Sequence, residues 1–255
     1  MTCLIRPLSR QEVRELDDQA ARKLDLPTLS LMENAGRGAA AWLAELTGTF
    51  SPGTAARPFS SHAREHVPSP PSVFPRVLVV CGPGNNGGDG GVVARHLDAW
   101  GFPVRIVWFA ARDQLHGDAV TQWRILDRSG VDQTTWYDTH PGIPEPAELD
   151  ALMAGADWLV DGLFGTGLAR PLVGSFRLVV EAMNRSAKPI LALDLPSGLD
   201  ADRGIPLGTA VRARATATFV APKPGFAAQG ASDYTGQVEV IDIGLPRKSL
   251  QPYLI

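Results

Sequence analysis

The chain has 255 residues, with 24 Lys and Arg against 27 Asp and Glu, and a formal net charge of -3. This near balance gives no basic footprint for nucleic acid, and 2 cysteines do not make a disulfide framework. No apolar run reaches transmembrane length, and the first residues lack the apolar core of a signal peptide. We therefore expect a soluble, cytoplasmic protein that binds neither nucleic acid nor membrane.

The first part of the chain predicts two helices. Ser9 is a candidate N-cap for a helix over 9–24, because Glu12 follows three residues later and completes a capping box. Residues 29–46 predict a second helix whose small side chains favour close helix packing. Asn34 lies among apolar neighbours there, either as a satisfied core amide or as a ligand contact.

Residues 51–75 differ from the rest of the chain. They are rich in Pro and Ser and show no periodicity, which predicts a surface insertion or linker. His62 and His66 have a spacing that suits metal binding on a helix, but the Pro content argues against a helix.

From Arg76 onward, apolar strands alternate with helical patterns. Strands are predicted over 76–82, 103–110, 157–165, 188–198, 215–225 and 236–244, and helices over 90–101, 118–130, 145–156 and 174–187. Strands separated by helices need crossover connections, so they lie parallel with helices on both faces. The sequence thus predicts one doubly wound α/β domain over 1–255, with the two N-terminal helices packed on it and the insertion at 51–75.

Four unusual stretches follow predicted strands and meet at one edge of the sheet, where such folds bind ligands. They are GPGNNGGDG at 82–90, DGLFGTGLARPL at 161–172, DLPSGLDAD at 194–202 and APKPG at 221–225. The first predicts a loop in which glycine permits positive φ and close ligand approach before a helix N-terminus that attracts phosphate. The alternative is a tight turn with Asn and Asp as turn residues.

Asp161 and Asp194 each follow an apolar run, so each carboxylate needs a cation, a hydrogen-bond donor or a raised pKa. The pair suggests a cation site or acid–base chemistry. Ser197 is a turn residue or an oxygen ligand, and Arg170 taken alone suits a solvated loop. Lys223, between two prolines, either reaches the ligand or faces water.

Six motifs in order carry a resemblance over nearly the whole chain. They are LMENAG at 31–36, GPGNNGGDG at 82–90, DGLFGTGLARP at 161–171, DLPSGLDAD at 194–202, PKPG at 222–225 and IDIGLP at 241–246. Together they resemble the NAD(P)H-hydrate epimerase family, also called the YjeF N-terminal domain. The resemblance implies a Rossmann-like three-layer α/β/α sandwich with a mainly parallel sheet. It also implies an isomerase that repairs nicotinamide nucleotides by interconverting the R and S forms of NADHX and NADPHX.

The resemblance also implies site residues. Asp194 matches the acidic residue at the reacting ring and is the expected catalytic group. Asn86, Asp161 and Ser197 match the residues that hold a potassium ion (K+). The expected substrate contacts besides Asp194 are Asn85, Asn86, Gly87, Gly88, Asp89, Gly165, Thr166, Gly167, Leu168, Ala169, Arg170 and Pro171.

Further expectations concern mechanism and partners. Loss of the carbon 6 hydroxyl as water would give an iminium, and water would return to the other face, with Asp194 giving and taking the proton. The resemblance implies a homodimer, and a dehydratase on a separate polypeptide because the chain stops soon after IDIGLP. The alternative is a non-catalytic nucleotide-binding or scaffold module. A nicotinamide oxidoreductase is disfavoured, since the ribose-binding acid after the second strand is missing.

Overall fold

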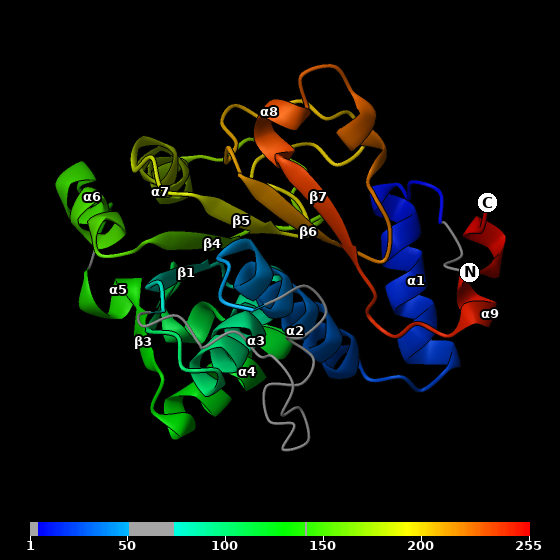
Figure 1. Cartoon of the computed structure of the whole chain (residues 1–255), viewed down its shortest axis with the longest axis horizontal. Helices are drawn as coiled ribbons and strands as arrows, with labels where there is room; N and C mark the ends of the chain where they lie inside the picture. The colour runs from blue at the N-terminus through cyan, green and yellow to red at the C-terminus, as the bar shows by residue number, and fades with distance from the viewer. Residues whose placement is uncertain (1–4, 51–73, 141) are drawn as a thin grey trace.

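The computed structural model describes residues 5–50, 74–140 and 142–255. Its centre is a seven-stranded sheet in the order β3-β2-β1-β4-β5-β6-β7, in which every pair of neighbours is parallel (Figure 1). The strands are β1 (Val77–Cys81), β2 (Val104–Trp108), β3 (Asp132–Thr135), β4 (Trp158–Gly162), β5 (Ile190–Leu193), β6 (Ala215–Phe219) and β7 (Gln237–Ile241). The predicted α/β class with a parallel sheet is confirmed.

Helices cover both faces of the sheet. The longer ones are α1 (Arg10–Lys23), α2 (Thr28–Leu46), α3 (Asn85–Ala99), α4 (Asp118–Ser129), α6 (Pro146–Ala154) and α7 (Gly174–Arg185), and the short ones are α5 (Trp136–Thr139), α8 (Ser232–Thr235) and α9 (Arg247–Leu250). Alternate residues of β1 explain the two layers. Val79 packs in the core with α1 to α4, whereas Val80 packs in the core with α6 and α7.

The structure differs from the predicted elements at β3. β3 was not predicted because it is short, polar and at the edge of the sheet, where only Thr135 is buried. The insertion predicted over 51–75, with His62 and His66, lies outside the described residues apart from its last two positions.

α3 begins at Asn85, so most of the stretch predicted as a Gly-rich loop is the first part of a helix. Within 82–91, all of which is described, no glycine has positive φ. A Cβ on Gly87 would lie 2.0 Å from the backbone oxygen of Gly82, and one on Gly90 would lie 2.7 Å from Sγ of Cys81. The glycines therefore allow α3 to pack tightly on the sheet, and this packing overrides their weak helix propensity.

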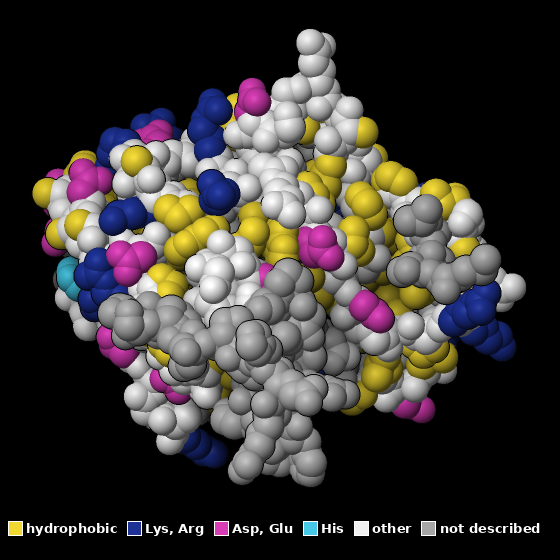
Figure 2. All heavy atoms as spheres, in the orientation of Figure 1, with side chains coloured by type: hydrophobic (Ala, Val, Ile, Leu, Met, Phe, Trp, Pro, Cys, Tyr) yellow, Lys and Arg dark blue, Asp and Glu magenta, His cyan; other side chains and the backbone are white. Residues whose placement is uncertain are grey.

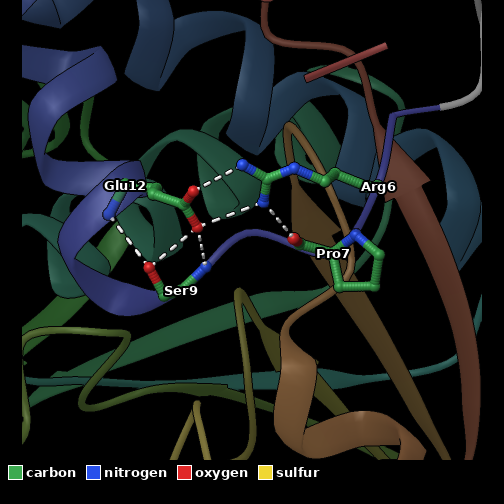
Figure 3. A network of polar contacts seen from close by, with 4 residues as sticks. All are labelled: Arg6, Pro7, Ser9 and Glu12. Atoms are coloured by element: carbon green, nitrogen blue, oxygen red, sulfur yellow. Dashed lines mark hydrogen bonds and ion pairs between the residues drawn. The ribbon is translucent and has the colours of Figure 1, made fainter. Parts of the chain in front are cut away.

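The start of α1 is held by a polar network (Figure 3). The Ser9 backbone N–H donates to Oε2 of Glu12 at 2.9 Å, and the Glu12 backbone N–H donates to Oγ of Ser9 at 3.3 Å, which confirms the predicted capping box. Arg6 donates to Oε1 of Glu12 at 2.6 Å. These bonds lower the pKa of Glu12 to about 2, and the largest cause is the hydrogen bond from Arg6.

The outer surface is mixed in charge. On the face shown in Figure 2, outside the grey segment, Lys and Arg side chains are scattered among Asp and Glu rather than gathered into one basic patch. Among the described residues, no helix is both long and apolar enough to cross a bilayer.

Candidate active site

A cavity of about 670 Å³ lies at the carboxyl edge of the sheet, where β1, β4, β5 and β6 end. Its walls come from the start of α3, the segment after β4, the residues after β5 and β6, and the N-terminal helices α1 and α2. This is the edge at which the four unusual stretches were expected to meet.

The structure separates the predicted substrate contacts into two groups. Gly87, Gly88 and Pro171 do not line the cavity. The two glycines instead pack against the protein, Gly87 on the backbone of Gly82 and Gly88 on α2 and α4. The residues that line it are Asn85, Asn86, Asp89, Gly165, Thr166, Gly167, Leu168, Ala169, Arg170 and Asp194.

Asp194 and Lys223 form an ion pair at the cavity, with Nζ of Lys223 2.8 Å from Oδ1 of Asp194. Lys223 is completely buried, and its ammonium also donates to Oγ1 of Thr218 and to the backbone oxygens of Phe219 and Ala221. The second carboxylate oxygen of Asp194 accepts from the backbone N–H of Thr166 at 3.0 Å. Lys223 therefore reaches the site through its ion pair with the Asp194 carboxylate.

The backbone at the ends of β5 and β6 is unusual. Asp194 has φ +67° and Val220 has φ +68°, in the left-handed region that residues with a Cβ rarely adopt. The Leu195 N–H donates to the Leu193 oxygen across the first, and the Ala221 N–H donates to the Phe219 oxygen across the second, both at 2.8 Å. Both residues line the cavity, and such strained positions cluster at functional sites.

Asp161 and Ser197 lie beneath the cavity and are fully buried. Oγ of Ser197 is 2.7 Å from Oδ1 of Asp161, and the Ser197 backbone N–H donates to Oδ2 at 2.8 Å. The Leu163 N–H donates to Oδ1 at 3.2 Å. Burial raises the pKa of Asp161 to about 6, although the hydrogen bonds from Ser197 and Leu163 oppose the rise.

Asn86 differs from this satisfied pair. Its side-chain oxygen and nitrogen are buried, and neither has a hydrogen-bond partner among the described residues. A buried amide without a partner is costly, so Asn86 needs a ligand that the protein itself does not supply.

Acidic groups from four elements surround the cavity. Burial and the nearby Asp194, Asp17 and Asp118 raise the pKa of Asp89 well above its usual value. Burial, followed by the charge of Asp194, raises the pKa of Asp17 to about 6. Burial, together with the charge of neighbouring acids, thus raises the pKa of both Asp17 and Asp89.

Several lining residues were not predicted from the sequence. They include Arg14 and Asp17 of α1, Thr28 of α2, His116 before α4, and Asp118, the first residue of α4. One signal was available for Asp17. It follows Val13 by four positions and precedes Ala20 by three, so an acid occupies the apolar face of its helix. Asn34, in contrast, donates to the backbone oxygen of Ile243 at 2.9 Å and does not line the cavity, which favours its structural interpretation.

The fold and the cavity define a doubly wound α/β protein with an acidic small-molecule site at the carboxyl edge of its sheet. The model of the family described as YjeF-related protein N-terminus matches residues 28–225, and the chain belongs to that family.

Relatives of known name agree with this assignment. The chain is 39% identical over 249 residues to the NAD(P)H-hydrate epimerase of Rhodopirellula baltica, covering 98% of this chain and 88% of the relative. It is 37% identical to the protein of that name from Pirellula staleyi, covering 97% and 96%. It also matches a bifunctional NAD(P)H-hydrate repair enzyme of Thermofilum pendens at 37% identity, covering 94% of this chain and 40% of that protein.

A solved structure supports the fold alone. The crystal structure of the yeast protein ynu0 matches with a TM-score of 0.72 at 21% identity, covering 98% of this chain and 93% of that one.

Proposed function

We propose that the protein is an NAD(P)H-hydrate epimerase, an isomerase that interconverts the R and S forms of NADHX and NADPHX at carbon 6 of the reduced nicotinamide ring. The names of relatives that align along nearly their whole length support this activity. The observation that carries it in the structure is the ion pair of Asp194 and Lys223, which places a charged carboxylate on the wall of a cavity large enough for much of a nucleotide.

The reaction exchanges the hydroxyl of carbon 6 between the two faces of the ring. The C–O bond breaks as the hydroxyl leaves with a proton as water, and the lone pair of the ring nitrogen forms an iminium. Water then adds to the opposite face and loses a proton. Asp194 acts as the acid–base group, and its negative charge stabilises the cationic ring. The neighbouring Thr166 N–H fixes the orientation of this carboxylate.

The substrate contacts follow from the lining of the cavity. Asn85, Asp89 and the segment 165–170 border it, and Arg170 is exposed at its rim, where a guanidinium can pair with phosphate in a bidentate manner. Asp89, whose pKa is raised by burial, can donate a hydrogen bond in its neutral form.

The donor set fits a potassium ion. Asn86, Asp161 and Ser197 offer amide, carboxylate and hydroxyl oxygens, the ligands that hard cations prefer, and the amide of Asn86 has no partner among the described residues. When bound, the ion would supply positive charge next to these residues and would order the Asn86 side chain. Asp161 contributes the compensating negative charge from its buried position.

The proposal extends to partners and location. The bifunctional relatives support a dehydratase that acts on the S form as the partner activity. We also propose a homodimer in the cytoplasm, which light scattering and fractionation of cells would test.

One coupled assay tests the activity. Mixed hydrates of NADH are treated with an S-specific dehydratase until only the R form remains, and the protein is then added in potassium buffer while NADH absorbance is followed. We expect full recovery of NADH. Binding of the hydrate in calorimetry without recovery would indicate a non-catalytic binding module and would refute the proposal.

A further inference from the structure

We infer that Asp17 of α1 is a second proton-transfer residue for carbon 6, so that Asp17 and Asp194 each serve one face of the ring. The inference rests on the proposed epimerase function. It adds a group from outside the family match, which begins at residue 28.

Asp17 lines the same cavity as Asp194. Asp17 comes from α1, whereas Asp194 directly follows β5. The charge of Asp194 raises the pKa of Asp17, and the charge of Lys223 lowers it. A ring bound in this cavity would border two carboxyl groups that come from different elements.

Contacts to the segments that follow β4, β5 and β6 hold α1 against the site. The backbone N–H of Leu8 donates to the oxygen of Pro222 at 2.9 Å, next to Lys223. The N–H of Arg10 donates to Oδ1 of Asp202 at 3.0 Å, and the guanidinium of Arg14 donates to the oxygen of Gly167 at 3.4 Å. α1 is therefore part of the wall of the site, and Asp17 has a defined position in it.

The two carboxyl groups differ in their surroundings. Asp194 has the buried ammonium of Lys223 at 2.8 Å. Asp17 has no ion pair of this kind among the described contacts, and burial together with Asp194 raises its pKa to about 6. The cavity therefore holds two carboxyl groups in different environments, one paired with an ammonium and one without such a pair, as acid–base pairs require.

The chemistry balances with these two groups. Asp17 gives its proton to the departing hydroxyl, the C–O bond breaks, and water leaves as the lone pair of the ring nitrogen forms the iminium. A water on the other face adds to carbon 6 and gives its proton to Asp194. No electrons are gained or lost, and the protein ends with one proton moved from Asp17 to Asp194. Exchange with solvent, or the reverse reaction, restores the first state.

The pH dependence follows from the groups around Asp17. It faces Asp194 after β5, Lys223 after β6, Asp89 on α3 and Asp18 on its own helix, and Arg14 lines the same cavity. Because the raised pKa keeps Asp17 protonated up to about pH 6, the wild-type kcat/KM for the R hydrate is expected to fall above that pH.

The test compares Asp17→Asn with Asp18→Asn in the coupled assay, with calorimetry of hydrate binding. Asp18 is the matched control, since it is adjacent and exposed and forms only a 3.7 Å pair with Arg22. We expect Asp17→Asn to lower kcat by about 10²–10⁴-fold, to keep hydrate binding and to abolish the fall above pH 6. Asp18→Asn should stay within about twofold of wild type, as surface changes usually do.

A kcat of Asp17→Asn near the wild-type value would overturn the inference and leave Asp194 as the single acid–base group. If Asp17→Asn fails to fold, Asp17→Glu decides. If Asp17→Glu folds and retains substantial turnover, with its fall in kcat/KM moved to another pH, the proton-transfer role of Asp17 is supported. If it folds and is inactive, that role is refuted. An inactive wild type would instead refute the proposed function, and this inference with it.

Discussion

Asp161 near the end of β4 and Asp194 directly after β5 lie close to the same edge of the sheet, yet the structure gives them different surroundings. Asp161 pairs with Ala192 in the sheet, so Asp194 lies two residues beyond that pair, just past the end of β5. Asp161 is 0% exposed and its carboxylate is held by backbone and serine donors, whereas Asp194 lines the cavity and faces an ammonium. A shift of two residues thus separates a carboxylate that is held by the protein's own donors from one that borders the cavity.

The largest expected effect comes from removing the Lys223 ammonium, which pairs with Asp194. Lys223→Met removes the buried charge opposite Asp194, and we expect a loss of about 3–5 kcal/mol in the free energy of unfolding, because a buried carboxylate loses its partner. Urea unfolding measures it, with Lys248→Met at an exposed position as the control. Equal stability of the two variants would show that Asp194 does not depend on Lys223.

Stabilisation of the fold by potassium should depend on the Asp161 carboxylate and not on that of Asp194. At a concentration near one hundred times its Kd, the ion is expected to stabilise the wild type by about 2.7 kcal/mol. Asp161→Asn should lose this increment, and Asp194→Asn should keep it. Thermal unfolding in potassium and in tetramethylammonium buffers gives the comparison. An increment that survives in Asp161→Asn would contradict the proposed ion site.

Ser197→Ala tests the partner of the buried carboxylate. The change removes the hydroxyl 2.7 Å from Oδ1 of Asp161 and the acceptor of the Phe164 N–H. We expect a loss of about 1–3 kcal/mol, the cost of leaving buried polar groups unsatisfied. Ser30→Ala, at an exposed position of α2, is the control and should change little. A loss no larger than that of the control would refute the role of this hydroxyl.

The smallest effect concerns the cap that orients α1 over Asp194. Glu12→Gln weakens the bonds to Ser9 and Arg6, and we expect a loss of about 1 kcal/mol at neutral pH. The folded pKa is about 2, below the ordinary value of 4.5, so this stabilisation is full above about pH 5 and disappears as pH falls toward 2. Unfolding at a series of pH values checks it, with Glu15→Gln as the control. A difference between wild type and variant that persists at pH 2 would contradict this account of the cap.

Much of the fold was predictable because its signals are local. Alternating strands and helices predicted the parallel sheet, and Ser9 with Glu12 predicted the cap of α1. The stretch at 82–90 was misinterpreted, since glycines that serve close packing look the same in a sequence as glycines that serve a loop. Only the structure, in which α3 lies close to the backbone after β1, distinguishes packing glycines from loop glycines.

The site was predictable in its edge and its motifs but not in its electrostatics. The strand pattern alone treats Asp161 and Asp194 alike, because each follows an apolar run, and only the family resemblance assigned them different roles. Their difference depends on residues far away in the chain, namely Ser197 for one and Lys223 for the other. The left-handed backbone at Asp194 and Val220 arises from the packing of whole strands and has no local signature in these residue types.

The most direct test of the central claim is kcat for the R hydrate, measured for Asp194→Asn and Asp161→Asn side by side in saturating potassium and saturating hydrate. Loss of the acid–base group should lower kcat by about 10²–10⁴-fold in Asp194→Asn, with hydrate still bound in calorimetry. Asp161→Asn should retain the greater part of kcat once folded. Full turnover by Asp194→Asn, or a larger loss in folded Asp161→Asn, would contradict the assignment of the chemistry to the carboxylate that lines the cavity.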